Sequence, residues 1–292
     1  MTFIDLFSGI GGFRLGMEMA EHICVGHCEI DQFANKSYIA MHKPKEGEWY
    51  ADDITRIRAE DIPKCDCWCF GFPCQDISVA GKQQGFRGQR SSLFFTVTQL
   101  IRGQKEENKP SYLLIENVKN LLSINRGVDF ARLLMELDEI GYNAERALLN
   151  TADVLPQNRE RVFIIGHLRG RSTRKVFPIG EEDRVAKELK LKLTALINGK
   201  NNQSSRIYDA SGLSPALNTF RGATPKVAVQ TVNGRRARYV TPRECFRLQG
   251  FLDDYFERVR EVCSDTQLYK QAGNGVTVPV VYEIAKKMEV DK

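Results

Sequence analysis

The sequence lacks the long hydrophobic runs and the leader features that direct a chain to a membrane. No apolar run among its 292 residues approaches the ~20 residues that a membrane-spanning helix needs. The N-terminus, MTFIDLFSGI, has no basic region before its apolar stretch and therefore matches a signal peptide poorly. Internal repeats and low-complexity tails are also missing. We therefore expect a globular chain that makes no membrane contact.

Cysteine is scarce and unevenly placed. Eight cysteines are too few for a disulfide scaffold, and four of them crowd into CDCWCFGFPC, which suits a reducing compartment. A zinc-binding module that also uses Cys74 is an alternative, but C-x-C-x-C spacing suits a tetrahedral site poorly because strand side chains alternate between faces. We expect no metal site, and we expect Cys65, Cys67 and Cys69 to pack in the core.

The excess of charge is small, but it is concentrated in one segment. The net charge is +5, whereas residues 168–240 contain 15 Lys/Arg and 5 Asp/Glu, a balance of +10 that leaves −5 for the remainder. A basic segment beside a slightly acidic body fits a polyanion-binding module next to a catalytic one. A solvated loop region with a chance excess of basic residues fits the same numbers.

Strand-like and helix-like segments alternate along the first 166 residues. Such alternation predicts an α/β fold with a mostly parallel, Rossmann-like sheet. The expected strands cover residues 2–7, 23–27, 67–70, 112–115, 144–149 and 161–165. The expected helices cover residues 13–20, 32–41, 132–140 and 282–288.

The regular alternation stops after Gly166. The next stretch contains GRSTRK, NGKNNQSS and NGRRARY, which are rich in Gly, Asn, Ser and Arg and typical of loops. A regular pattern returns at Gln271. We therefore expect a catalytic domain over residues 1–169, a small loop-rich domain over 170–265, and a C-terminal segment, 266–292, that returns to the first domain.

A glycine turn, FSGIGGF, follows the first expected strand. Glycine lets a ligand approach the backbone, and the N-terminus of the helix that follows favours negative charge. Glycines 9, 11, 12 and 16 do not match the G-x-G-x-x-G pattern of a dinucleotide pyrophosphate site. The turn alone is weak evidence for a ligand site, and tight packing alone is the alternative.

Two acids follow the next expected segments, where a parallel sheet binds ligands. Glu29 comes after the second strand, at a position where an acid can bind ribose hydroxyls, and Asp53 could take an exocyclic amine. Together with the glycine turn, they suggest a nucleoside cofactor without a required phosphate. S-adenosylmethionine fits this description.

Cys74 lies in the sharpest local motif, GFPCQ at residues 71–75. Pro73 fixes its own backbone φ and biases Phe72 toward extended geometry, which would present Cys74 rigidly, as a nucleophile needs. The segment at residues 75–92 carries glycines 81, 85 and 88 and the basic residues Lys82, Arg87 and Arg90. Such a loop could close over a polyanionic substrate, or it could be an ordinary surface loop.

Charged side chains also accompany two later strands. Glu116 closes the strand expected at residues 112–115, where a carboxyl can donate a proton. Taken alone, an acid in this position is more often structural. Arg159 and Arg161 are two residues apart, so extended chain would place both on one face. Two guanidinium groups there could grip an anion or a polar base edge, or form an exposed ion-pair face.

Taken together, the motifs resemble the DNA (cytosine-5) methyltransferase family. The matching stretches run from Asp5 to Val276 in the order DLFSGIGGF, Glu29, DDI, GFPCQ, ENVKN, QNRERVFIIG, RECFRLQGF and KQAGNGV. Each motif is weak alone, whereas the ordered set is specific. The resemblance implies a large cofactor-binding catalytic domain and a small target-recognition domain, and the basic segment lies where the latter belongs.

The resemblance also implies roles for individual residues. Cys74 resembles the nucleophile that attacks C6 of cytosine, and Glu116 the acid that contacts N3 and the amino group. Arg161 resembles the residue that binds the base oxygen, and Arg159 supports the site nearby. Cofactor contacts are implied or expected at Phe7, Gly9, Ile10, Gly11, Glu29, Ile30, Asp53, Ile54, Gly71, Pro73, Leu93, Asn274 and Gly275.

DNA contacts are expected from two parts of the chain. The first part supplies Gln75, Ser78, Lys82 and Arg90. In the basic segment, Arg221 is the expected base reader, with contact to phosphate alone as the alternative. Arg235, Arg236 and Arg238 are expected to bind phosphates.

The implied reaction is transfer of a methyl group from S-adenosylmethionine to C5 of a flipped-out cytosine in a specific DNA sequence, through a covalent Cys74 adduct. The implied partners are double-stranded DNA and, if the protein is the modification half of a restriction-modification pair, a cognate restriction endonuclease. The compact form resembles bacterial and phage-borne members of the family. We therefore expect a monomer in the bacterial cytoplasm.

Two alternatives stay open within this resemblance. One branch of the family acts on RNA with the same motifs, so a tRNA cytosine-5 methyltransferase is the first alternative. A catalytically silent DNA-binding relative is the second, and the intact Cys74, Glu116 and Arg161 argue against it. The sequence also departs from the family pattern, with a short recognition domain and with Ala216 and Leu217 where a Thr-Leu pair is common.

Overall fold

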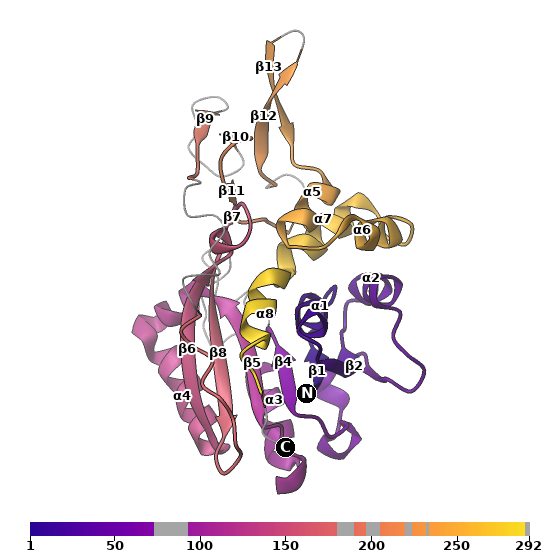
Figure 1. Cartoon of the computed structure of the whole chain (residues 1–292), viewed down its shortest axis with the longest axis vertical. Helices are drawn as coiled ribbons and strands as arrows, with labels where there is room; N and C mark the ends of the chain where they lie inside the picture. Colours follow the sequence, from indigo (N-terminus) through magenta and orange to yellow (C-terminus); the bar gives the residue numbers. More distant parts are fainter. Residues whose placement is uncertain (73–92, 180–189, 197–204, 220–223, 232–233, 290–292) are drawn as a thin grey trace.

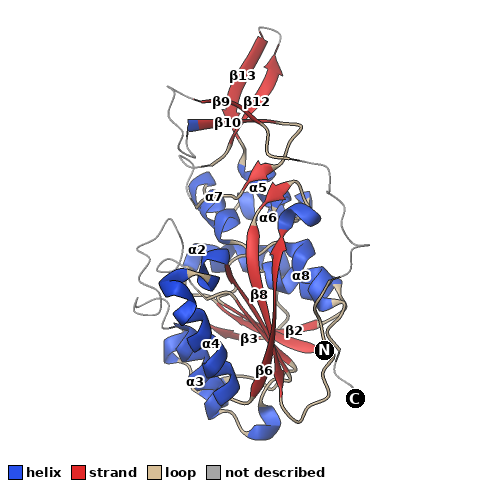
Figure 2. Cartoon of the chain, turned by 90° about the vertical axis from the view of Figure 1, so that its left-hand side faces the viewer, coloured by secondary structure: helices blue, strands red, loops and turns tan. Residues whose placement is uncertain are grey.

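The computed structural model describes residues 1–72, 93–179, 190–196, 205–219, 224–231 and 234–289 (Figure 1). A large sheet with helices on its faces lies at one end of the long axis, and a small sheet lies at the other end. A group of helices lies between the two sheets. The view turned by 90° in Figure 2 shows the same order along the axis.

Seven strands form the large sheet, and they are β1 (Thr2–Leu6), β2 (Ile23–Cys28), β3 (Trp49–Ala51), β4 (Cys67–Phe70), β5 (Tyr112–Val118), β6 (Tyr142–Asn150) and β8 (Glu160–Leu168). Their order is β3-β2-β1-β4-β5-β8-β6. The pairs from β3 to β5 are parallel, and β8 runs antiparallel to both β5 and β6. β4 is buried along its whole length, as expected for a strand covered on both faces.

Four helices cover the two faces of this sheet, and they are α1 (Gly12–Met19), α3 (Leu93–Gly103), α4 (Val128–Glu139) and α8 (Val278–Ala285). α3 and α4 pack on the face that carries Trp68 and Phe70. α1 and α8 pack on the opposite face, around Phe3 and Phe163. The C-terminal helix α8 thus completes the core of the N-terminal sheet.

A second group of helices contains α2 (Gln32–His42), α5 (Pro242–Leu248), α6 (Asp253–Arg260) and α7 (Asp265–Asn274). These helices share a core built around Phe246, Phe251 and Phe256. Thr241 begins α5 with a capping box, because its hydroxyl accepts from the Glu244 N–H while the Glu244 carboxylate accepts from the Thr241 N–H. The group lies between the two sheets in Figure 1.

The small sheet contains β9 (Leu193–Leu196), β10 (Arg206–Asp209), β12 (Lys226–Thr231) and β13 (Gly234–Tyr239), in the order β13-β12-β10-β9. β10 and β12 are parallel, and the other two pairs are antiparallel. β7 (Gln157–Asn158) and β11 (Ser214–Pro215) form a separate parallel pair. β7 directly precedes a strand of the large sheet, and β11 lies between two strands of the small sheet in the sequence, so this pair connects the two parts of the protein. Short 3-10 helices are η1 (Ile54–Arg56), η2 (Ala59–Asp61), η4 (Glu106–Asn108), η5 (Lys119–Leu122), η6 (Ile124–Gly127) and η7 (Thr151–Asp153).

The predicted α/β class with a mostly parallel sheet is confirmed, while several element boundaries are wrong. β5 extends past residue 115 to Val118, because its pairing with β8 continues until Val118 faces Arg161. α4 begins at Val128, four residues before the expected start, directly after Gly127 with a φ of 84°. The helices α5 and α6 are missing from the sequence-based prediction, which expected only loops there.

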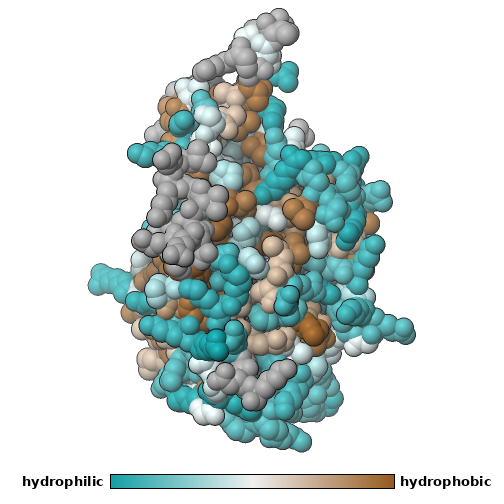
Figure 3. All heavy atoms as spheres, in the orientation of Figure 1, coloured by the Kyte–Doolittle hydropathy of each residue, from teal (hydrophilic) through white to brown (hydrophobic). Residues whose placement is uncertain are grey.

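The surface in the orientation of Figure 1 is largely hydrophilic over α5 and α6 (Figure 3). These helices carry arginines and acids that pair with each other, among them Arg243 with Asp253 and Arg247 with Asp253. Within the described part of the chain, every helix is too short or too polar to cross a membrane.

Candidate active site

A cavity of about 790 Å³ lies at the carboxyl ends of β1, β2, β4 and β5. Ligands bind at this edge in open parallel sheets. Many of the predicted catalytic and cofactor positions line the cavity, namely Phe7, Gly9, Glu29, Ile30, Asp53, Ile54, Gly71, Leu93, Glu116, Arg159, Arg161 and Asn274. The fold therefore gathers motifs that are separated by more than half of the sequence.

The turn after β1 forms one wall of the cavity through Phe7 and Gly9. The φ values of Phe7, Gly9 and Gly11 are 54°, 56° and 78°, a region that glycine adopts without strain. The Gly9 N–H donates to Oε2 of Glu29 at 2.7 Å, and the Asp31 N–H donates to Oε1 at 2.7 Å. Burial raises the pKa of Glu29, and these backbone bonds oppose the shift. Glu29 thus ties the turn to the start of α2 at the edge of the cavity.

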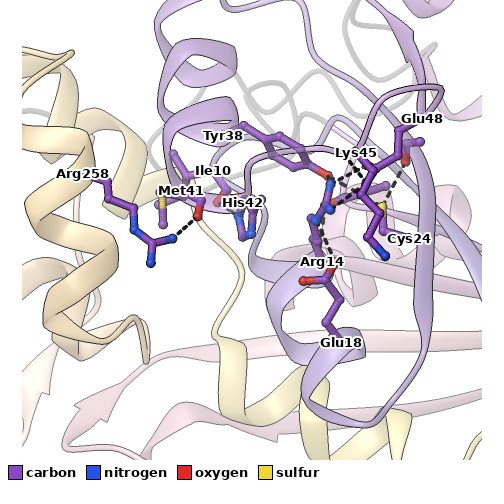
Figure 4. A network of polar contacts seen from close by, with 12 residues as sticks. Ile10, Arg14, Glu18, Cys24, Tyr38, Met41, His42, Lys45, Glu48 and Arg258 are labelled. Atoms are coloured by element: carbon purple, nitrogen blue, oxygen red, sulfur yellow. Dashed lines mark hydrogen bonds and ion pairs between the residues drawn. The ribbon is translucent and has the colours of Figure 1, made fainter.

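His42, the last residue of α2, supports the same turn from behind (Figure 4). Its Nε2 lies 2.9 Å from the carbonyl oxygen of Ile10, which can only accept, so Nε2 carries the proton. Burial lowers the pKa of His42 to about 3 and keeps the ring neutral. Gly11 faces the ring so closely that a Cβ would lie 2.8 Å from Cδ2 and 3.0 Å from Cε1.

Three expected cofactor contacts lie behind this wall rather than in it. The side chain of Ile10 is buried in the core shared with α5, α6 and α7. Gly11 is covered by His42, and a Cβ on Gly275 would face Ile10 at 3.9 Å. The two motifs that carry them are therefore partly a wall of the cavity and partly its support.

The helix that follows the turn is anchored by Arg14, whose side chain is buried (Figure 4). Its guanidinium binds both carboxylate oxygens of Glu48, at 2.8 and 3.1 Å, and Oε1 of Glu18 at 2.9 Å. Arg14 also donates to the hydroxyl of Tyr38 at 3.3 Å. These bonds fix α1 to α2 and to the loop before β3, next to the glycine turn.

Asp53 and Ile54 also line the cavity. Oδ1 of Asp53 accepts from the Thr55 hydroxyl at 2.7 Å and from the Thr55 N–H at 2.9 Å, and these bonds lower the pKa of Asp53. Ile30 also lines the cavity and is 72% exposed, unusual for an isoleucine. An exposed apolar side chain between two carboxylates suits a flat ring with hydroxyl or amine substituents.

Glu116 and Arg161 face each other across adjacent strands. Oε1 of Glu116 lies 3.0 Å from Nε of Arg161, and both side chains are largely buried. Glu116 lies inside β5, opposite Phe163, so the prediction that it closes the strand is wrong. Oε2 of Glu116 points toward Gly71, where an added Cβ would lie 3.2 Å away. Glycine at position 71 therefore keeps the carboxylate accessible from the cavity.

Arg159 and Arg161 both line the cavity, but their side chains serve different contacts. Nη2 of Arg159 donates to the carbonyl oxygens of Gly273 and Gly275, at 3.1 and 2.9 Å. Arg159 is 3% exposed, whereas Arg161 turns to Glu116. Arg159 therefore binds the C-terminal Asn-Gly motif to the centre of the site.

The segment that leads to Cys74 is fixed at its start. Nδ2 of Asn117 donates to the carbonyl oxygen of Phe72 at 3.1 Å, and Phe72 lines the cavity. Cys74 itself lies outside the described residues, and so do the other predicted contacts Pro73, Gln75, Ser78, Lys82, Arg90 and Arg221. The basic loop expected at residues 75–92 also lies outside the described residues.

The expected phosphate contacts of the basic segment lie on β13. Arg236 is exposed on this strand, and the side chain of Arg235 is outside the described part. Arg238 pairs instead with Glu244, with N–O distances of 2.6 and 2.8 Å. Its charge is therefore already partly neutralised within the protein.

The predicted packing role of Cys65, Cys67 and Cys69 is confirmed, because all three thiols are buried. Cys67 and Cys69 point to the same face of β4, with their Sγ atoms 3.7 Å apart. Burial raises the pKa of both Cys65 and Cys69. Among the residues that the structure describes, no cluster of three His, Cys, Asp or Glu side chains could hold a metal ion.

About half of the residues that line the cavity were not predicted from the sequence. They are Cys28, Asp31, Ala34, Asp52, Thr55, Phe72, Thr96, Asn117, Val118, Lys270, Gln271 and Gly273. Several of them are direct neighbours of predicted residues within the same motifs. Lys270 binds Asp31 at 2.5 Å, a contact over 239 residues of sequence that no local pattern signals. Asp31 could have been found as the N-cap of α2.

The charge of the wall indicates what the cavity can bind. The described lining contains the carboxylates of Glu29, Asp31, Asp52, Asp53 and Glu116 and the cations of Arg159, Arg161 and Lys270. Arg161 and Lys270 are already paired with acids of the same wall. An acidic wall of this kind suits a cationic ligand with hydroxyl and amine donors better than a pyrophosphate.

Comparison with known proteins gives matches over nearly the whole chain. Residues 1–205 and 179–290 match the model of the C-5 cytosine-specific DNA methylase family. Type II methyltransferase M1.ScrFI of Lactococcus lactis subsp. cremoris is 35% identical over 98% of this chain and 77% of its own length. Type II methyltransferase M.HhaI of Haemophilus parahaemolyticus is 33% identical over 98% of this chain and 93% of its own.

Solved structures share the same architecture at lower identity. The Dnmt2 methyltransferase of S. pombe superimposes with a TM-score of 0.72 at 22% identity, over 98% of this chain and 97% of its own. A prophage-encoded DNA modification methyltransferase from E. coli, described as putative, gives a TM-score of 0.67 at 21% identity, over 98% of both chains. At these identities the likeness concerns the fold alone.

Proposed function

The chain belongs to the C-5 cytosine-specific DNA methylase family and is a DNA cytosine methyltransferase, and we propose that it methylates C5 of a flipped-out cytosine through a covalent Cys74 adduct. The observation that carries this proposal is the meeting of Glu116 and Arg161, 3.0 Å apart, in one wall of the cavity that Phe72 also lines. Cys74 follows Phe72 by two residues in the sequence.

S-adenosylmethionine, which members of this family use, fits the acidic side of the cavity. Glu29 and Asp53 supply carboxylates for hydroxyl and amine groups, and Ile30 supplies an exposed apolar surface for a ring. The carboxylates also favour a ligand with positive charge. When bound, S-adenosylmethionine supplies an electrophilic methyl group on its sulfonium. Glu29, Ile30, Asp53, Leu93 and the backbone at Gly9 would hold it.

The chain contributes the activation of cytosine. C5 of cytosine is a poor nucleophile, and addition of the Cys74 thiolate to C6 makes it electron-rich. The S–C6 bond forms and C5 takes the methyl group, while the methyl–sulfonium bond breaks and leaves its electron pair on the sulfur. Water then accepts the C5 proton, and the S–C6 bond breaks to release the Cys74 thiolate and restore the aromatic ring. Glu116 donates a proton or a hydrogen bond at N3, which draws electron density from C6 during the addition.

Arg161 holds Glu116 and the base in one plane. Its Nε binds Oε1 of Glu116, and the guanidinium has further N–H donors for the base oxygen. Arg159 supports this arrangement, because it ties the chain just before β8 to the carbonyl oxygens of Gly273 and Gly275. The cytosine must leave the duplex to reach this depth, which is the reason for base flipping.

DNA binding is assigned to the basic part of the chain. Residues 170–265 would form the target-recognition domain between the catalytic domain, 1–169, and the C-terminal segment, 266–292. Arg236 is exposed on β13 and suited to a phosphate contact, and Arg221 is the proposed base reader. Gln75, Ser78, Lys82 and Arg90 would contact DNA next to Cys74.

The direct test is methyl transfer from labelled S-adenosylmethionine to duplex DNA and, in parallel, to tRNA. The proposal predicts label in 5-methyl-2′-deoxycytidine after digestion of the DNA, and no label in the tRNA. Label in tRNA alone would instead identify the RNA-modifying alternative. Bisulfite sequencing of DNA from cells that express the protein would then give the target sequence.

A further inference from the structure

Gln157 opens the QNRER motif, yet it does not line the cavity as Arg159 and Arg161 do. Its side chain is 0% exposed. Its Nε2 donates to the carbonyl oxygen of Leu248, the last residue of α5, at 2.7 Å. Its Oε1 accepts from the backbone N–H of Leu217 at 3.2 Å. One amide therefore links the end of a helix to the segment at residues 214–219.

Backbone pairing holds the 214–219 segment against the same stretch. Gln157 pairs with Ser214 in the parallel contact of β7 with β11, and the Ser214 N–H donates to the Pro156 carbonyl oxygen at 2.8 Å. Side-chain and backbone bonds thus act at the same place, one residue from Asn158 and two from Arg159. A shift of this segment would therefore also displace the nearby residues of the cavity wall.

The far end of the 214–219 segment lies directly behind the cavity. A Cβ on Gly273 would lie 2.6 Å from the carbonyl carbon of Asn218 and 2.9 Å from the Thr219 nitrogen, so there is no room for a side chain. Gly273 lines the cavity with its other side. The chain that leads to Arg221 is therefore attached to the catalytic site at two points, Gln157 and Gly273.

We propose that Gln157 is a positioning residue for target selection, which holds the 214–219 segment in one register relative to the cavity. This inference rests on the proposed function and deepens it, because it names the contact that couples sequence recognition to the reacting base. Gln157 touches neither cofactor nor cytosine. It acts through Leu217, whose register sets where the residues that follow can meet the DNA.

An amide is suited to this task because it donates and accepts in one planar group. Leu248 offers a half-buried carbonyl oxygen and Leu217 a buried N–H, and both would lose this partner without Gln157. Methionine has a similar shape and can satisfy neither group. A carboxylate keeps the bond from Leu217 but repels the Leu248 carbonyl oxygen.

The test measures selectivity as a ratio, on a library of duplex DNA with random sequence. The quantity is the methylation rate at the preferred site divided by the rate at sites that differ by one base pair. A change that only unfolds part of the enzyme lowers both rates equally, so the ratio does not move. A change in the register of the 214–219 segment lowers the ratio.

Gln157→Met should lower this ratio roughly tenfold, the effect of losing one or two buried hydrogen bonds. Its affinity for S-adenosylmethionine should stay near that of the wild type. Gln249→Leu is the matched control, because Gln249 is equally buried and its side-chain amide bonds Ala272 and Thr277 rather than Leu217. This control should lower stability and leave the ratio unchanged.

A ratio for Gln157→Met that equals the wild type, or a fall that Gln249→Leu reproduces, overturns the proposal. If Gln157→Met does not fold, Gln157→Glu decides alone: a smaller fall, roughly threefold, supports the proposal, and an unchanged ratio overturns it. A wild-type protein that methylates no DNA contradicts the proposed function, and the inference with it. A wild type that methylates DNA while the ratio is insensitive to Gln157 contradicts the inference alone.

Discussion

Gly11→Ala perturbs the glycine turn at the point where the turn meets its support. The new methyl group would lie 2.8 Å from Cδ2 of His42 and 3.0 Å from Cε1, and even closer to Nε2. His42 cannot retreat freely, because its Nε2 binds the Ile10 carbonyl oxygen (Figure 4). Its ring also contacts the rings of Tyr38 and Tyr255. The turn itself must therefore shift, and with it the Gly9 N–H that binds Glu29.

The cost has two parts that the structure separates. Alanine at the φ of 78° found for Gly11 costs about 1–2 kcal/mol, and forcing an extra methyl into a packed place costs about 1–3 kcal/mol. The expected loss in the free energy of unfolding is therefore about 2–5 kcal/mol. Gly47→Ala is the matched control, because Gly47 has a φ of 86° and nothing within 4 Å of an added Cβ. It should lose only the first part, about 1–2 kcal/mol.

Urea denaturation of both variants measures these values, and titration with S-adenosylmethionine measures cofactor affinity. Gly11→Ala should be the less stable variant and should bind the cofactor more weakly, while Gly47→Ala should bind it normally. Adding His42→Ala to Gly11→Ala should recover the steric part as a coupling energy between the two sites. Equal stability of Gly11→Ala and Gly47→Ala would refute the reasoning, since the contact with His42 would then cost nothing.

Other predictions concern the reaction and the acid side of the stability curve. Glu116→Gln keeps a hydrogen-bonding side chain beside Arg161 but cannot donate a proton at N3, so single-turnover methylation should fall by about 10²–10⁴-fold; a wild-type rate would remove Glu116 from the mechanism. Arg238 lowers the pKa of Glu244 from 4.5 to about 2, so the pair should stabilise the fold above pH 4.5 and lose that effect as the pH falls toward 2. Arg238→Met should therefore flatten the loss of stability in this pH range, and an unchanged acid profile would contradict the role of the pair.

The fold was predictable where local pattern decides it. The apolar run at residues 67–70 is a strand at the same residues in the structure. A short apolar run between polar segments predicts a buried strand from sequence alone. The extension of β5 to Val118 was not predictable, since Glu116 and Asn117 are polar and their extended conformation comes from pairing with β8. α5 was missed although its capping box, Thr241 to Glu244, stood in the sequence.

The residues of the site likewise divide into those that the sequence predicts and those that only the tertiary structure reveals. Glu29 and Asp53 could be proposed from their places after successive strand-like segments, and both line the cavity. The ion pair of Lys270 with Asp31 and the contact of Gly273 with Asn218 depend on how α7 packs, which no local signal encodes. His42 was overlooked because its importance comes from the Ile10 carbonyl oxygen, 32 residues away. Sequence motifs thus indicated residues of the cavity wall, while the residues that support them required the tertiary structure.

The most direct test of the account is covalent trapping of the enzyme on DNA. A duplex that carries 5-fluoro-2′-deoxycytidine at the methylated position is incubated with S-adenosylmethionine and the protein, and the products are separated under denaturing conditions. Fluorine replaces the C5 hydrogen that must leave as a proton before the enzyme is released. Because fluorine cannot leave in this way, the Cys74 sulfur should stay bonded to C6. We expect a denaturation-resistant complex with the wild type, attached at Cys74 by peptide mapping, and no such complex with Cys74→Ser. Active methylation of the unmodified duplex without any such complex, or a complex that persists in Cys74→Ser, would contradict the central claim.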